Sequence, residues 1–148
     1  MHEKLKINPP LYMIGIKTSC WRCDAEMSVI ALLAPHVEDT DNQVCLLSDV
    51  DELPEEVLQT IQKRVPTFKR KFSKMAGKSY FANTCPKCGV LFGDFFLHEE
   101  PGAPLFPTDE EEAKSIYMTE ITLSGSIAVK ASLGFGIGEL ILENAKKI

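Results

Sequence analysis

Two Cys-x-x-Cys pairs constrain this chain more than any other feature of its sequence. The pairs are Cys20–Cys23 and Cys85–Cys88, and residues 24–84 lie between them. Two residues between paired cysteines let the chain fold back, so that both sulfurs can bind one ion in a tetrahedral array at about 2.3 Å. We therefore expect one shared metal site that joins two distant parts of the chain.

The second pair has the features of a tight metal-binding turn. Pro86 stiffens the inside of the turn, and Gly89 follows at a position that can require positive φ. Thiolates are soft ligands, and four of them suit Zn²⁺ or, in rubredoxin-like sites, Fe. Zn²⁺ is the preferred ion because nothing else in the sequence indicates redox chemistry. Four protein ligands leave no open coordination position, so the expected role of the metal is structural.

We expect no catalysis from this chain. The sequence contains no phosphate-binding glycine loop, nucleophile elbow or Ser/His/Asp arrangement.

Two alternatives to a shared metal remain: each Cys-x-x-Cys pair could be a thioredoxin-type redox pair, or the cysteines could simply be buried. The redox alternative is disfavoured because neither pair lies at the strand-to-helix junction of a clear βαβ unit.

Composition places the chain among ordinary globular proteins. It has 148 residues, five cysteines, and 16 Lys and Arg against 21 Asp and Glu, which gives a formal net charge of -5. An odd number of cysteines fits a reducing compartment better than a disulfide framework. The N-terminus lacks the layout of a secretory signal, and no apolar run is long enough to span a membrane. We expect a soluble cytoplasmic protein without membrane contact.

Hydrophobic patterns around the cysteine pairs predict strands. The apolar runs that flank the pairs lie at residues 11–17, 27–34, 79–84 and 90–98. The chain is expected to form a single α+β domain over residues 1–148, with a four-cysteine zinc ribbon from residues 11–34 and 79–98. A long, charged, helical insertion over residues 36–78 is predicted to separate the two halves of the ribbon, with one helix from about Leu53 to Arg64.

The C-terminal region, residues 109–148, is predicted to be a β-segment plus a helix. Thr108 or Asp109 can cap a short helix. Alternating apolar and polar residues over 121–135 indicate β-structure, with a hairpin turn or bulge at Ser124–Ser126. From Ile137 to Ile148 the apolar spacing becomes helical.

The sequences SCWRC and ANTCPKCGVLFGDFFLHEE resemble zinc-ribbon or rubredoxin-like proteins of bacteria and phages. The resemblance covers only the two cysteine pairs and their neighbours. It implies a four-cysteine zinc ribbon at Cys20, Cys23, Cys85 and Cys88 and brings no established activity. The long segment between the pairs departs from the compact ribbon.

Positive charge is concentrated after the predicted helix. Residues 63–78 interleave basic and aromatic side chains, a mixture that binds phosphates and stacks on bases. The candidate nucleic-acid contacts are Lys69, Arg70, Lys71 and Lys74. The alternative is that Phe68 and Phe72, four residues apart, anchor a helix whose lysines are solvated or face the acidic tract before it.

Trp21, the only tryptophan, lies inside the first cysteine pair. It could anchor a partner or pack over the metal site. The leading hypothesis is a small binding module whose structural metal makes a surface rigid for a protein partner. A nucleic-acid-associated protein that uses residues 63–78 is the first alternative. A small inhibitor or immunity protein that binds an enzyme is the second.

Overall fold

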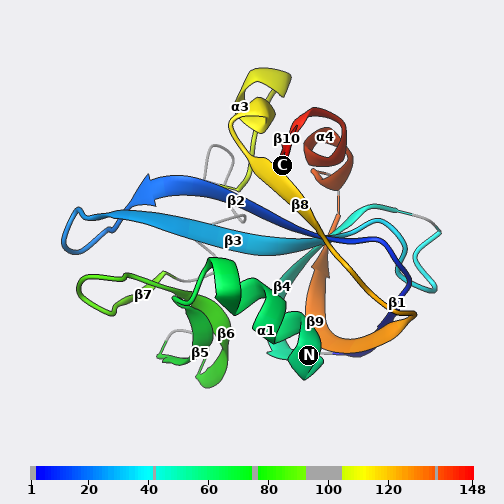
Figure 1. The fold of residues 1–148 in the computed structure, drawn as a ribbon, viewed down its shortest axis with the longest axis horizontal. Coiled ribbons are helices and arrows are strands. Elements are labelled where there is room, and N and C mark those ends of the chain that lie inside the picture. The colour runs from blue at the N-terminus through cyan, green and yellow to red at the C-terminus, as the bar shows by residue number, and fades with distance from the viewer. Residues whose placement is uncertain (1–2, 42, 75–76, 93–104, 136) are drawn as a thin grey trace.

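The computed structural model describes residues 3–41, 43–74, 77–92, 105–135 and 137–148. Strands predominate, and three helices accompany them within those ranges (Figure 1). In chain order the elements are β1 (Glu3–Ile7), β2 (Leu11–Ser19), β3 (Glu26–Ala34), β4 (Cys45–Glu52), α1 (Glu55–Arg64), β5 (Phe68–Ser73), β6 (Lys78–Thr84), β7 (Leu91–Phe92), α3 (Glu110–Lys114), β8 (Tyr117–Ile121), β9 (Ile127–Gly134), α4 (Gly138–Asn144) and β10 (Lys146–Lys147).

The main sheet has the strand order β1-β9-β4-β3-β2-β8-β10, and all its pairs are antiparallel except β8 with β10. Three strands separate β1 from β2 in this order, so a flat sheet would place them about 19 Å apart. Residues 8–10, which connect them, allow a span of only about 14 Å. The sheet therefore curls and brings β1 towards β2.

A smaller group of strands branches from β4. β6 pairs with β4 at Val50 and Phe81, and β5 and β7 pair with β6 on either side. This branch carries the second cysteine pair, while the long β2–β3 hairpin carries the first.

Apolar side chains of the curled sheet form one core on each of its faces. Along β3, Ile30 and Leu32 belong to a core that includes Val57 and Ile61 of α1. Val29 and Leu33, which alternate with them, belong to a second core that includes Ile141 of α4. Figure 1 shows α1 on one side of the β2–β3 hairpin and α3 and α4 on the other. β3 is buried on both faces, which explains its almost continuous apolar sequence.

The predicted strands over residues 11–17, 27–34 and 79–84 are confirmed as β2, β3 and β6. The helix ending at Arg64 is confirmed as α1. Asp109 caps α3, since its side chain accepts a hydrogen bond from the backbone N–H of Glu112 at 2.8 Å. At the level of a mixed α and β protein, the predicted fold class agrees with the structure. Of the predicted strand at 90–98, only β7 is described, and residues 93–98 lie outside the described ranges.

The segment 36–78 is not the long helical insertion that the sequence suggested. Among its described residues only α1 is helical, and the segment also contains the strands β4 and β5. Phe68 and Phe72 lie on β5, where Phe68 faces Asn83 and Phe72 faces Ser79 in register. Two residues spaced four apart share one face of a helix. They also share one face of a strand, because strand side chains alternate with a period of two residues.

The C-terminal prediction also requires correction. The predicted turn at Ser124–Ser126 does not form a hairpin, because β8 pairs with β2 whereas β9 pairs with β1 and β4. The last helix ends at Asn144, and the final residues form β10 beside β8. The backbone N–H of Lys146 donates to Ile116 O and that of Ile148 to Met118 O, at 2.8 and 3.0 Å. Hydrogen bonds to the edge of β8 therefore hold these residues in an extended conformation, although their apolar spacing suits a helix.

Candidate metal centre

The first cysteine pair occupies the turn between β2 and β3. The N–H of Cys20 donates to Ala25 O at 2.8 Å, and the N–H of Asp24 donates to Cys20 O at 3.0 Å. Asp24 closes the turn with φ of 64°. This left-handed conformation is unusual for a residue other than glycine, although Asp tolerates it better than most.

The second pair occupies an equivalent turn between β6 and β7. The N–H of Cys85 donates to Val90 O and the N–H of Gly89 to Cys85 O, both at 2.9 Å. Gly89 has φ of 75°, as its position in the sequence predicted. The hydrogen bonds and the residue with positive φ fall at the same positions in both turns. The chain therefore builds the same local structure twice and presents two sulfurs from each copy.

The four sulfurs converge. Their Sγ atoms all lie within 4.8 Å of one another, with Cys20 3.7 Å from Cys88 and Cys23 3.6 Å from Cys85. Four sulfurs at about 2.3 Å from a tetrahedral ion would be separated by about 3.8 Å, whereas a disulfide requires about 2.05 Å. The arrangement fits a metal site and not a pair of disulfides. Cys20, Cys23, Cys85 and Cys88 could thus hold one metal ion, as their spacing predicted.

Backbone amides prepare two of the sulfurs for the thiolate form. The N–H groups of Cys88 and Lys87 point at the Cys85 sulfur from 3.5 and 3.4 Å, and they lower the pKa of Cys85 to about 6. The amides of Cys23 and Arg22 lower the pKa of Cys20 in the same way. Hydrogen bonds to a charged form favour that form, and metal binding requires it.

Cys23 behaves differently. The amide of Ala25 acts to lower its pKa, but burial and the three other sulfurs outweigh this contribution and raise the pKa to about 11. A fourth negative charge beside three sulfurs is unfavourable unless a cation is present. A cation bound among the four sulfurs would offset this repulsion and favour the thiolate form of Cys23.

Asn83 joins the two halves of the site. Its side chain is fully buried, with Nδ2 donating to Ile30 O and Oδ1 accepting from Ile30 N, both at 2.9 Å. Ile30 lies on β3, the strand that leaves the first turn, and Asn83 precedes Cys85 by two residues. One side chain thus sets the position of β6 relative to the hairpin that carries the other cysteines. The sequence analysis missed this residue, because an isolated Asn in a strand gives no signal of its partner.

Trp21 makes a second connection. Its indole N–H donates to Leu91 O on β7 at 2.9 Å, although 62% of the residue is exposed. The side chain therefore links the first turn to the strand that follows the second, and it also presents most of its surface to solvent.

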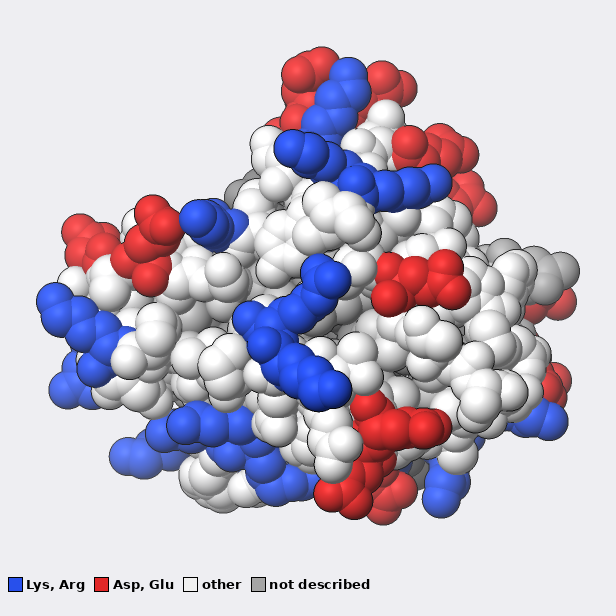
Figure 2. Space-filling model, viewed as in Figure 1, with Lys and Arg blue, Asp and Glu red and all other residues white. Residues whose placement is uncertain are grey.

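Of the candidate nucleic-acid contacts, Lys69, Arg70 and Lys71 lie on β5, and Lys74 follows it. Figure 2 shows a band of basic side chains where β5 and β6 lie in Figure 1. Arg70 is engaged within the protein: it pairs with Asp51 at 3.3 Å, donates to the backbone O of Asp51 and lies 4.6 Å from the centroid of the Phe81 ring. Within the described ranges, no ion pair involves Lys69, Lys71 or Lys74. Arg70 thus differs from the other three candidate phosphate contacts, because its guanidinium group already interacts with Asp51 and Phe81.

The fifth cysteine is not part of the cluster. Cys45 is buried in the core around α1, and burial raises the pKa of its thiol. Cys20 and Cys85 pack instead against the core on the other face of the sheet.

Comparison with protein families, curated proteins and solved structures gave no match to this chain. In the part of the chain that the structure describes, no helix has the length and apolar character needed to cross a bilayer.

Proposed function

We propose that this chain is a non-catalytic zinc-binding protein of the zinc-ribbon type, in which Cys20, Cys23, Cys85 and Cys88 hold one structural Zn²⁺. Two similar turns that each offer two thiolates are the arrangement on which zinc ribbons rely. Four sulfur ligands fill a tetrahedral coordination sphere, so no position remains for a substrate or a reactive water. Zn²⁺ is preferred over Fe because no other redox feature accompanies the cysteines.

The metal makes a surface for a protein partner rigid, and Trp21 is the observation that carries this proposal. An exposed tryptophan is a frequent anchor of protein interfaces. Here the indole N–H is already fixed by Leu91 O, so the ring loses little conformational freedom when it binds. Trp21 is adjacent to Cys20, and Leu91 follows Cys88 by three residues. The bound metal therefore controls the shape of the surface around Trp21.

The test uses the zinc-loaded protein as bait in an extract of its source cells. We expect a specific protein to be retained by the native chain and lost from Trp21→Ala. Phe135→Ala is the matched control, since Phe135 is another exposed aromatic residue, 51% accessible, outside the cysteine turns. The metal content of each variant is measured first, so that loss of zinc is not mistaken for loss of a contact.

Fluorescence gives a second readout. Trp21 is the only tryptophan, so its emission reports on this surface alone. Binding of the retained partner should shift the emission to shorter wavelength, because an exposed indole becomes buried. Unchanged emission on binding, or equal retention by Trp21→Ala, rejects the proposed surface.

Nucleic-acid binding along β5 is a second candidate, favoured by Phe72. This side chain is 57% exposed, and Lys71 is its neighbour on an outer strand. An exposed aromatic ring on an outer strand can stack on a base while lysines of the same strand, here Lys69 and Lys71 on its other face, contact phosphates. Arg70 has no part in this candidate because Asp51 and Phe81 already engage it.

Binding to single-stranded DNA and RNA at several salt concentrations tests this candidate. Replacing Lys69, Lys71 and Lys74 with Glu should abolish binding and its steep salt dependence. A variant with Glu at Lys63, Lys146 and Lys147 has the same net charge and should retain binding. Equal losses in the two variants indicate a general charge effect, and absence of binding at low salt rejects the candidate.

A further inference from the structure

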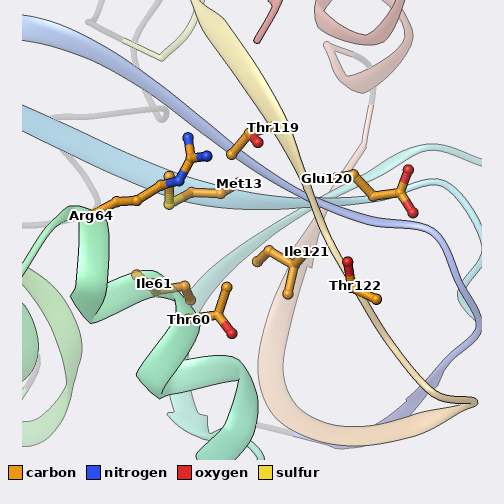
Figure 3. A pocket seen from close by; sticks show the side chains of 8 residues that line it. All are labelled: Met13, Thr60, Ile61, Arg64, Thr119, Glu120, Ile121 and Thr122. Atoms are coloured by element: carbon orange, nitrogen blue, oxygen red, sulfur yellow. The ribbon is translucent and has the colours of Figure 1, made fainter.

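The hollow between α1 and β8 has a closed floor (Figure 3). Met13, Ile61 and Ile121 line its inner side, and each of them is at most 2% exposed. A small molecule therefore finds little apolar surface there. The outer edge of β5 is more accessible, since it presents backbone groups and charged side chains to solvent.

β5 turns half of its backbone groups outward. It pairs with β6 alone among the strands that the structure describes. Thr67, which precedes β5, accepts a hydrogen bond from the N–H of Thr84 at 3.1 Å. This pair and every second pair after it therefore carry the hydrogen bonds of the antiparallel ladder. The N–H and C=O groups of Phe68, Arg70 and Phe72 point away from β6.

At Phe68 the outward groups already have partners. Its N–H donates to Val65 O, and its C=O accepts from the side-chain amide of Gln62, both at 3.1 Å. The N–H and C=O groups of Arg70 and Phe72 have no partner among the residues that the structure describes. Two N–H and two C=O groups are thus open to a further strand.

Two other outer strands of the chain are covered. On β7, Leu91 O accepts a hydrogen bond from the indole of Trp21 at 2.9 Å. On β1, Lys6 O accepts one from the N–H of Glu38 at 3.0 Å. Proteins commonly cover strand edges in this way and so prevent pairing with other chains. The open edge of β5 is therefore a place where a strand from another chain can add.

The positive charge at this edge comes from Lys69 and Lys71. Both side chains lie on the face opposite to Phe72, because side chains alternate along a strand. Within the described ranges, no ion pair involves either lysine. Arg70 contributes little, since its guanidinium group reaches across β6 and pairs with Asp51 of β4 at 3.3 Å.

Charge and exposure together select an acidic and partly apolar strand. Two copies of β5 side by side would bring their lysines together, so a second copy of this chain is disfavoured. An acidic strand is attracted to the same lysines. On the other face, Phe72 is 57% exposed and offers an apolar contact. A strand in which acidic and apolar residues alternate matches both faces.

We infer that an extended segment of a partner protein, with alternating acidic and apolar residues, adds to the sheet as a strand antiparallel to β5. Its acidic side chains contact Lys69 and Lys71, its apolar side chains contact Phe72, and its backbone bonds to Arg70 and Phe72. A peptide is favoured over a nucleic acid, because only a peptide backbone pairs with the open N–H and C=O groups. This surface is separate from the one around Trp21, since β5 and β7 lie on opposite sides of β6.

The test is a titration of the zinc-loaded, ¹⁵N-labelled protein with an acetylated and amidated octapeptide in which Glu and Val alternate. A Kd of about 0.1–1 mM is expected, since only a short stretch of the edge is open. NMR shifts should be largest at the amides of Arg70 and Phe72. Exchange of these two amides with solvent should slow about tenfold at saturation, because the added strand covers them.

N-methylated peptides test the backbone hydrogen bonds. In an antiparallel pair, the peptide residues opposite Arg70 and Phe72 turn their N–H groups towards β5, and their side chains lie on the Phe72 face. Methylation of the Val nitrogens should therefore abolish binding. Methylation of the Glu nitrogens, which face solvent, is the matched control and should leave binding almost unchanged. Retained binding by the peptide methylated at Val overturns the inference.

Charge is tested with a double variant, Lys69→Gln with Lys71→Gln, which should weaken binding about tenfold. Lys146→Gln with Lys147→Gln removes the same charge from exposed positions on β10, and it should leave binding unchanged. Equal affinity of the native chain and the first variant, or equal weakening in both variants, overturns the inference.

The two competing occupants have outcomes of their own. Dimerisation of the protein alone, with shifts at Arg70 and Phe72 that grow with protein concentration, assigns the edge to a second copy. Tighter binding of an eight-nucleotide thymidine oligonucleotide than of the peptide, at the same amides, assigns it to nucleic acid. Either result overturns the inference.

Discussion

At Ile30, the side chain of Asn83 makes the two backbone hydrogen bonds that a neighbouring strand would otherwise make. β3 pairs with β4 only from Leu32 to Ala34, so the N–H and C=O of Ile30 would be left without partners inside the protein. The amide of Asn83 supplies one acceptor and one donor to them. A buried polar group is tolerated only when its hydrogen bonds are made, so Asn83 and Ile30 depend on each other. The pair fixes β6, and with it Cys85, at this position.

Asn83→Leu, a change of similar volume, should lower the free energy of unfolding of the zinc-bound protein by about 2–4 kcal/mol, because two backbone groups lose their partners. It should also weaken zinc binding, since the two turns lose their alignment. Urea denaturation and competition with a zinc-binding dye measure the two effects. Asn144→Ala removes only a local bond to Leu140 O in α4, so a loss there of about 1 kcal/mol or less is the expected control. Equal losses in both variants would contradict the role given to Asn83.

Gly138 shows where the backbone leaves no room for a side chain. A Cβ atom there would lie 2.8 Å from Val44 Cγ1 and 2.9 Å from the Val44 carbonyl carbon. Gly138→Ala should therefore destabilise the protein by about 1–3 kcal/mol, although alanine favours the helix. Gly125→Ala is the control, since a Cβ atom at Gly125 meets nothing within 4 Å. Thermal unfolding compares the two, and equal melting temperatures would disprove the close approach.

At the scale of elements, the sequence predicted the turns and strands whose pattern is local. The Cys-x-x-Cys spacing and Gly89 identified the turns, and apolar runs identified β2, β3 and β6. The sequence did not predict β5 or β10, because each depends on a partner strand that is distant in the chain. Phe68 and Phe72 suit a helix or a strand equally until β6 is placed beside them. The positive φ of Asp24 also escaped prediction, and the signal that could have indicated it is Gly89 at the equivalent position of the second turn.

The metal site supports one core more than the other. Cys20, Cys85 and Phe92 belong to the core on the α4 side, whereas the core around α1 includes none of the four ligands. Removal of zinc should therefore loosen the cysteine turns and β7 first, while α1 and β9 keep their hydrogen bonds.

Hydrogen exchange of the protein treated with a chelator measures this difference. We expect fast exchange at the amides of Cys20, Cys85 and Gly89, and retained protection at Ile61 and Val129. Equal loss of protection in both cores would show that the metal supports the fold as one unit.

At the scale of the whole molecule, the metal site closes a long loop of chain. Residues 24–84 leave the first turn, contribute β3, β4, α1, β5 and β6, and return to the second turn. Ordering such a loop costs conformational entropy, which the curled sheet and the metal offset together. Both cysteine turns meet because the branch of strands from β4 carries β6 back towards β3. This topology was not readable from the sequence, since it depends on pairs such as Val50 with Phe81.

X-ray absorption spectroscopy at the zinc edge, on protein purified without added metal, tests the central claim most directly. We expect one zinc per chain, surrounded by four sulfur atoms at about 2.3 Å. Nitrogen or oxygen atoms in the coordination sphere, or a folded protein that contains neither zinc nor iron, would contradict a four-cysteine metal centre.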